Sequence, residues 1–113
     1  MEQHYKLFRV RELADNDEDF ILVLAQTFLE EVPADAKILK ESVENKSYLA
    51  TYQTAHKMKP TIDLFELGVL DDLIEVQDWG KFEKKEIDIF PKLEIVLAAV
   101  ENTVNEMKED FSL

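Results

Sequence analysis

The sequence predicts an all-α protein, an antiparallel four-helix bundle with a short additional N-terminal helix or arm. Its 113 residues include only 2 glycines and 3 prolines, too few for the repeated tight turns of a β-sandwich or barrel. No segment of useful length alternates apolar and polar residues as a half-buried strand does. Several segments instead repeat apolar residues every three to four positions, the spacing of one helix face. We expect a single domain covering residues 1–113.

The first elements are a short opening segment and a long amphipathic helix. Residues 5–14 are expected to form either a helix or an arm that straps the bundle. Asn16 or Asp17 is expected to cap the following helix, because a short polar side chain there can bond the free backbone N–H groups of the first turn. The apolar stripe of that helix consists of Phe20, Ile21, Leu24, Phe28 and Val32.

Two prolines bear on where the next helices end. Pro33 is expected to end the first long helix and to begin another, because proline suits a first helical turn. Ser47 is expected to cap a helix that runs through His56. Pro60 has no N–H to bond the carbonyl of His56. We expect a kinked but continuous helix there, the alternative being a helix that ends at Lys59.

Two further helices are predicted in the C-terminal half. One follows Gly68 and ends near Gly80, where glycine suits a C-cap. The last begins near Pro91 and has apolar residues alternately four and three apart, a heptad-like seam. Such a seam can face a bundle core or the partner in a coiled-coil dimer, and we expect a monomer. The seam consists of Leu93, Leu97, Val100, Val104, Met107 and Phe111.

The overall charge and composition restrict the classes of partner. The chain carries 25 acids against 13 bases, a net charge of −12, which disfavours binding to a nucleic-acid backbone. It contains no cysteine, which excludes disulfides and thiolate metal sites. The first ten residues lack the apolar core of a signal peptide, and no apolar run reaches the roughly 20 residues of a membrane span. We expect a soluble cytoplasmic protein without a nucleic-acid or membrane partner.

The candidate functional residue is His56, which lies between two lysines. At about 100° per residue, it lies roughly 120° from the centre of the apolar side of its helix, so we expect an exposed ring. Lys59 follows one turn later, and Lys57 is adjacent. Two ammonium groups disfavour imidazolium and attract an anion, so we expect a neutral, nucleophilic ring that meets a phosphoryl group. The alternative is a surface histidine beside two solvated lysines.

Other kinds of chemistry find little support in the sequence. The positions four residues before and after His56 hold Tyr52 and Pro60, which are not usual metal ligands, so we expect no metal site. No glycine-rich phosphate loop is present. Without a nucleotide site the chain is expected to be a phosphoryl carrier rather than an enzyme, and to need no cofactor of its own.

The stretch AHKMKPTIDLFELG, from Ala55 to Gly68, resembles the signature of histidine-containing phosphotransfer (HPt) domains. That signature reads Ala-His-x-Leu-Lys-Gly with a later glycine. Ala55, His56 and Lys59 match it, and Met58 stands in for the leucine. The order of segments resembles the family over nearly the whole chain. The resemblance implies a four-helix bundle that exposes the histidine on one helix.

The resemblance also implies a function. HPt domains accept a phosphoryl group from an aspartate of a receiver domain and pass it to another receiver, in hybrid histidine kinases or response regulators. His56 is then the phosphorylated residue, and Lys59 stabilises the phosphoryl charge. The Mg²⁺ needed for transfer belongs to the receiver. Lys57, Tyr52 and Asp63 are expected at the binding surface, with Asp63 holding the ammonium of Lys59.

Two positions depart from the family pattern. Pro60 replaces the glycine after the lysine, and Glu66 aligns with the later glycine, whereas Gly68 comes two residues further on. These departures leave open an alternative, a non-catalytic helical module that binds a receiver or another partner without phosphotransfer.

Overall fold

The computed structural model describes residues 4–113, which form five helices and contain no β-strand. The all-α prediction is therefore confirmed for this part of the chain. No helix within these residues combines the length and the apolarity needed to cross a lipid bilayer. The helices are α1 (Phe8–Leu13), α2 (Glu18–Glu44), α3 (Tyr48–Leu64), α4 (Leu70–Lys81) and α5 (Phe90–Asp110).

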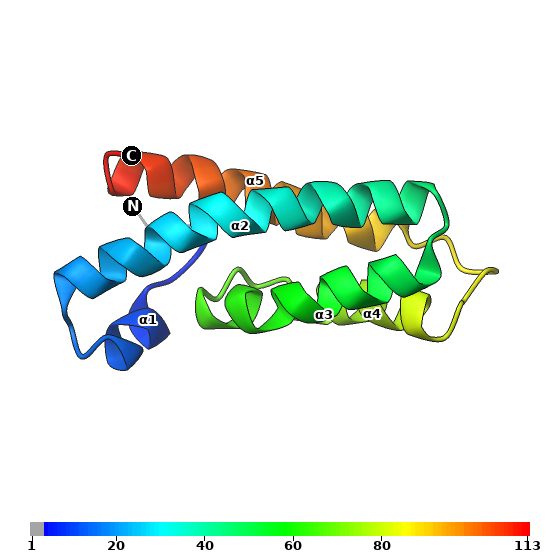
Figure 1. Cartoon of the computed structure of the whole chain (residues 1–113), viewed down its shortest axis with the longest axis horizontal. Helices are drawn as coiled ribbons and strands as arrows, with labels where there is room; N and C mark the ends of the chain where they lie inside the picture. The colour runs from blue at the N-terminus through cyan, green and yellow to red at the C-terminus, as the bar shows by residue number, and fades with distance from the viewer. Residues whose placement is uncertain (1–3) are drawn as a thin grey trace.

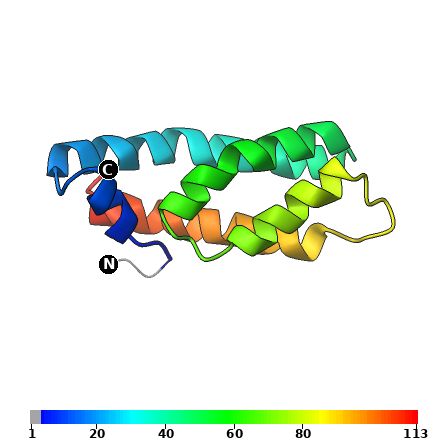
Figure 2. The same ribbon diagram turned by 90° about the horizontal axis from the view of Figure 1, so that it is seen from below.

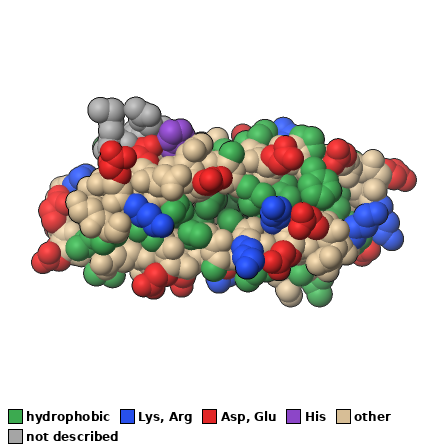
Figure 3. All heavy atoms as spheres, turned by 90° about the horizontal axis from the view of Figure 1, so that it is seen from above, with side chains coloured by type: hydrophobic (Ala, Val, Ile, Leu, Met, Phe, Trp, Pro, Cys, Tyr) green, Lys and Arg blue, Asp and Glu red, His purple; other side chains and the backbone are tan. Residues whose placement is uncertain are grey.

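The four longer helices lie lengthwise against one another in a body of 45 × 22 × 20 Å, and the short α1 lies at one end beside the start of α2 (Figures 1 and 2). Close contacts join α2 to α3, α3 to α4, α4 to α5 and α5 to α2. Each long helix therefore has two neighbours, and their apolar stripes meet in the middle. The outer face seen from above mixes acidic, basic and hydrophobic side chains (Figure 3).

The core is built from the predicted stripes, with one exception in α2. Phe28 is 1% exposed and Leu24 packs at the edge of the core, but the ring of Phe20 is 42% exposed. Phe20 was expected in the stripe, and this was wrong. It lies in the first turn of α2, whereas Ile21 turns inward and is fully buried. A stripe repeating every four residues drifts around a helix of 3.6 residues per turn, so its first member leaves the core face.

Pro33 does not end a helix, contrary to the prediction. It lies inside α2, which is a single helix of 27 residues, Glu18–Glu44. Val32 and Ala36, on either side of the proline, are both buried in the same core. A proline in a helix interior removes one hydrogen bond at a cost of about 3 kcal/mol. Burial of one continuous stripe before and after it outweighs that local cost.

The other helix ends follow the sequence more closely. The carboxylate of Asp17 accepts hydrogen bonds from the N–H groups of Asp19 and Phe20, so Asp17 rather than Asn16 caps α2. Ser47 precedes α3 as predicted, and its carbonyl accepts a bond from the N–H of Thr51, although its side chain makes no capping bond. Pro91 lies in the first turn of α5.

The heptad-like seam of α5 is used within the chain itself. Leu93, Val100 and Met107 are at most 3% exposed, and the other seam residues pack against the core from its edge. The seam that suited either a bundle or a coiled coil is thus accounted for by packing against the neighbouring helices.

The opening segment combines both predicted forms, a strap followed by a short helix. Tyr5 and Leu7 are buried, and the N–H of Lys6 donates to the carbonyl of Phe65 at 2.8 Å. The backbone carbonyl of His4 accepts a bond from the hydroxyl of Thr103 on α5. The strap therefore joins the end of α3 to α5, two segments far apart in the sequence.

Candidate functional site

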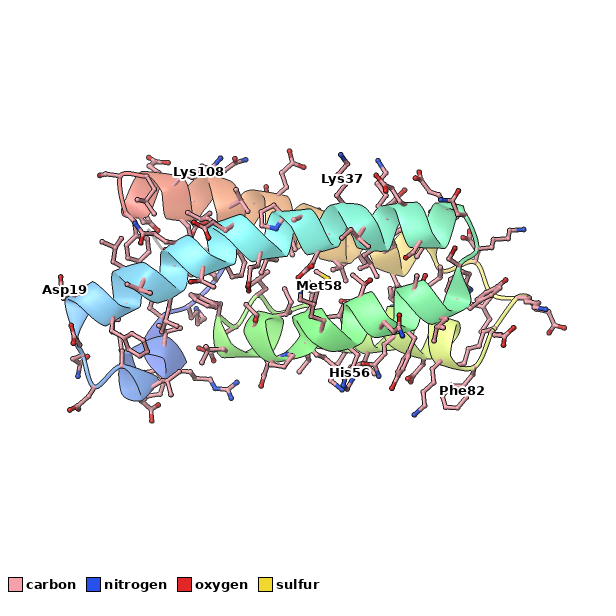
Figure 4. All side chains as sticks on the ribbon, viewed as in Figure 1. Asp19, Lys37, His56, Met58, Phe82 and Lys108 are labelled. Carbon is pink, nitrogen blue, oxygen red and sulfur yellow. The ribbon has the colours of Figure 1, made fainter. Side chains whose placement is uncertain are left out.

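His56 lies on the outer surface of α3. Its side chain is exposed and projects away from α2, whereas Met58, two residues later, points between α2 and α3 (Figure 4). The ring of Tyr52 stacks on the His56 ring, with 5.7 Å between centroids and 30° between planes. The predicted core of this helix is confirmed, because Ala55, Met58 and Ile62 are fully buried beneath the surface that carries the histidine.

Pro60 lies within α3 and does not end it, so the continuous helix is confirmed. Its ring nitrogen cannot donate to the carbonyl of His56, which leaves that carbonyl without its usual partner one turn later. The side chain of Pro60 is itself exposed. The histidine therefore lies on an intact helix whose backbone is locally free of one hydrogen bond.

One edge of α3 carries four of the five predicted site residues. Tyr52, His56, Lys59 and Asp63 are spaced four, three and four residues apart, so they follow one side of the helix over about 16 Å. Lys59 is half-buried and forms none of the ion pairs found within the described range 4–113. Of the two lysines of α3, it is the one that shares this edge with His56.

Lys57 lies about 100° round α3 from His56, on the side nearer to α2. Its ammonium bonds the carboxylate of Asp35 on α2 at 3.0 Å, and the Asp35 side chain is only 10% exposed. That hydrogen bond and the charge of Asp35 raise the pKa of Lys57 above its ordinary value. The structure thus gives the two flanking lysines different surroundings: Lys57 joins α3 to α2, and Lys59 shares the edge with His56.

Asp63 contacts a residue that sequence reasoning did not identify. It was expected to hold Lys59, but its carboxylate and its backbone carbonyl both accept hydrogen bonds from Arg9 of α1, at 2.8 and 3.1 Å. The bond and the charge of Asp63 raise the pKa of Arg9. The pair spans 54 residues of sequence, so no local spacing could have indicated it. Its effect is to fasten the end of α3 to α1.

Gly80 positions α4 against the histidine helix. It was predicted to be a C-cap, but it lies inside α4, which ends at Lys81. A Cβ atom at Gly80 would lie 2.5 Å from the carbonyl oxygen of Tyr48 and 2.8 Å from the amide nitrogen of Tyr52. The absence of a side chain therefore serves close packing of two helices rather than a left-handed turn.

Gln77 was also missed by the sequence analysis. It lies one turn before Gly80 on the same face of α4, and the chain reverses direction between α3 and α4 (Figure 2). Gln77 therefore faces the part of α3 about 4.5 Å further along, which is the turn from Tyr52 to His56. The residue is 8% exposed, and its amide oxygen has no hydrogen-bond partner among the described residues. A buried polar group without a partner is uncommon, and this one lies under the same stretch of α3 that carries the exposed histidine.

Glu66, which aligns with the later glycine of the HPt signature, lies beyond the end of α3. Its backbone has φ +51°, in the left-handed region that favours glycine. It follows His56 by ten residues, which corresponds to about 15 Å along a helix axis. The acid is therefore well removed from the histidine ring.

Within residues 4–113 no group of three or more histidine, aspartate or glutamate side chains is arranged to hold a metal ion. Comparisons with family models, curated proteins and solved structures found no match for this chain.

Proposed function

We propose that this chain is a histidine phosphotransfer intermediate of a two-component phosphorelay. The observation that carries the proposal is the exposed ring of His56 on an unbroken helix, with Lys59 one turn later on the same edge. Among residues 4–113 the ammonium of Lys59 has no ion-pair partner. A carrier of this kind needs an accessible nucleophile and a nearby positive charge rather than an enclosed pocket. The helical surface offers both.

The proposed reaction moves one phosphoryl group from oxygen to nitrogen. The lone pair of a ring nitrogen of His56, Nε2 in the HPt family, forms the P–N bond to an aspartyl phosphate of a receiver domain. The P–O bond breaks, and its electron pair leaves with the aspartate carboxylate. The other ring nitrogen keeps its proton, so no proton transfer is required. Lys59 stabilises the negative charge on the transferred group.

The surroundings of the ring supply orientation. Tyr52 stacks on one side of the imidazole, with 5.7 Å between the ring centroids. A hydrogen bond from a ring nitrogen to a fixed partner selects the tautomer of a histidine. In this proposal the proton stays on Nδ1, so the lone pair of Nε2 is free to attack.

We also propose how the helices run, and that the chain acts as a single copy with receiver domains as its partners. The four longer helices form an antiparallel bundle, and the chain acts as a cytoplasmic monomer that diffuses between receiver domains. The receiver contributes Mg²⁺ and the phosphorylated aspartate. Such encounters are transient, so the interface is expected to be small, below about 1,200 Å².

A second candidate function is a helical module that binds a receiver without chemistry. The specific feature in its favour is Pro60, which replaces a glycine beside the histidine and carries an exposed ring. A bulkier surface next to His56 hinders close approach of a phosphoaspartate. A tight complex with an unphosphorylated receiver and no transfer supports this alternative.

The test of the proposed function uses the purified chain and receiver domains from the same organism that have been phosphorylated with ³²P. The wild type is expected to acquire a label that is lost in acid and stable in alkali, as phosphohistidine is. His56→Gln removes the nucleophile and is expected to abolish the label while the helical circular dichroism stays unchanged. His4→Gln is the matched control, because the only other histidine pairs with Glu106 at 2.6 Å. Label that persists in His56→Gln disproves the assignment.

A further inference from the structure

A second feature lies on the same side of the molecule as His56, at the end of α4. Figure 4 shows His56 and Phe82 projecting from one side, whereas Lys37 and Lys108 project from the opposite side. Phe82 is 61% exposed, and Leu49 at the start of α3 is 68% exposed. Single exposed apolar residues are ordinary on protein surfaces. These two belong to a continuous surface, which we call the α4-end patch: Leu49, Tyr52, Lys81, Phe82 and Lys84.

The patch surrounds a shallow hollow between α3 and α4. A cavity of about 230 Å³ is lined by side chains of both helices, among them Leu49, Tyr52 and Lys81. Gly80 forms its floor, because its missing Cβ lets the helices meet closely there. A hollow of this size accommodates one side chain of a partner rather than a small-molecule ligand.

The lysines of the patch are held by aromatic rings rather than by acids. The ammonium of Lys81 lies 5.9 Å from the ring centroid of Tyr52 and 5.3 Å from that of Phe82. Lys84 lies 6.0 Å from the Phe82 centroid. Among residues 4–113 neither lysine has an ion-pair partner, in contrast to Lys57 and Lys92, which contact carboxylates. The ring faces position the two positive charges without neutralising them.

Tyr52 connects the patch to the candidate site. The Tyr52 ring stacks on His56 and also lies under Lys81. A partner that contacts both His56 and Phe82 therefore also covers Tyr52. The other end of the histidine helix differs. There Asp63, Glu66 and Asp71 line a cavity of about 410 Å³ together with Lys6 and Arg9, and Arg9 is already paired with Asp63. Acids therefore outnumber bases around that cavity, three to two.

We propose that the α4-end patch is the docking surface for the acidic face of a receiver domain, the face that presents its phosphoaspartate to His56. The inference rests on the proposed phosphotransfer function. A receiver must surround its phosphorylated aspartate with further carboxylates to bind Mg²⁺, so the approaching surface is acidic. In a chain of net charge −12, uncompensated lysines beside exposed aromatic rings attract such a surface, while Phe82 and Leu49 supply the apolar contact.

An acid at the edge of the patch allows the opposite change of charge to be tested. Glu83 lines the same cavity and is exposed. Its negative charge opposes an acidic partner. Glu83→Gln is therefore expected to strengthen docking, whereas Lys81→Glu with Lys84→Glu is expected to weaken it. Charge changes of opposite sign at neighbouring positions must have opposite effects if complementarity decides binding.

The experiment compares two phosphoryl donors. The first is the purified, phosphorylated receiver domain that labels the wild type fastest, titrated to find its half-saturating concentration. The second is potassium phosphoramidate, a small donor that needs no protein interface. Phe82→Ala and the double lysine variant are expected to raise the half-saturating receiver concentration about tenfold or more and to leave phosphoramidate labelling unchanged. The matched control, Lys37→Glu with Lys108→Glu, alters charge on the opposite side.

The outcomes separate the two proposals. If the wild type is labelled at His56 by neither donor, the proposed function is wrong and the docking inference falls with it. If labelling is normal but Phe82→Ala leaves half-saturation unchanged, or the control variant weakens it equally, only the docking inference is overturned. The same holds if light scattering shows that the wild type is a dimer and that Phe82→Ala makes it a monomer.

Discussion

The two ends of α3 are packed differently by the rest of the chain. The C-terminal end is fastened by the strap and by α1: the N–H of Lys6 in the strap bonds the carbonyl of Phe65, and Arg9 of α1 bonds Asp63 twice. The N-terminal end leaves Leu49 exposed and meets α4 at Gly80 and through the rings of Tyr48 and Trp79, whose centroids are 4.6 Å apart. His56 lies between these ends. One end of the helix therefore maintains the fold, and the other leaves surface available beside the histidine.

The largest effect on stability is expected from separating α4 from the N-terminal end of α3, which we call the open end. Gly80→Ala places a Cβ atom against the α3 backbone, and one of the two helices must shift. We expect the free energy of unfolding to fall by about 1–3 kcal/mol or more, the usual effect of overpacking. Urea unfolding measures the change.

Gly68→Ala is the matched control for that substitution. Gly68 has φ +77°, but a Cβ atom there meets nothing within 4 Å. Gly68→Ala should lower the free energy of unfolding by about 1–2 kcal/mol, through backbone strain alone. If the Gly80 variant is no less stable than the Gly68 variant, close packing at the open end is not what Gly80 provides.

The middle of α3 is tested by comparing its two lysines. Lys59→Ala removes the charge that shares the edge with His56, and we expect phosphoryl uptake from a receiver to slow by about ten- to a hundredfold. Lys57→Ala removes a side chain that is engaged with Asp35 on α2, and uptake should change by less than about twofold. Equal slowing in both variants would contradict the different roles. The measurement is the initial rate of labelling at one receiver concentration.

The smallest effect, a local change in hydrogen exchange, is expected at the C-terminal end of α3. Arg9→Ala removes both bonds to Asp63, and the amide proton of Lys6, which bonds the carbonyl of Phe65, should exchange with solvent faster. Amides near Tyr52 should keep their rates, because the change lies at the other end of α3. Hydrogen exchange followed by NMR resolves both regions.

Arg11→Ala provides the comparison for this last variant. Arg11 also forms an exposed ion pair, at 2.8 Å, but with Glu18 rather than with α3. Arg11→Ala should leave the exchange rate of the Lys6 amide proton unchanged. A uniform rise in exchange across both ends of α3 in the Arg9 variant would show that the strap supports the whole fold instead of one end.

The features predicted correctly from sequence are those that depend on neighbours along one helix. Few glycines, the apolar repeats and the spacing of His56 from the buried side were enough to predict an all-α chain and an exposed ring, because 3.6 residues per turn relates sequence spacing directly to position around the axis. The continuity of α3 through Pro60, expected although the proline lacks an N–H, is confirmed as well.

The features that were missed depend on which helix lies beside which. Pro33 failed to end α2 because the apolar residues before and after it share one core. Lys57 is drawn to Asp35 and Asp63 to Arg9, partners 22 and 54 residues away. Gly80 is required by the backbone of α3 rather than by its own turn. Only the packed structure brings such groups together, since contacts between helices have no fixed spacing in the sequence. Within the described part of the chain, this packing gives Lys57 an ion-pair partner and Lys59 none.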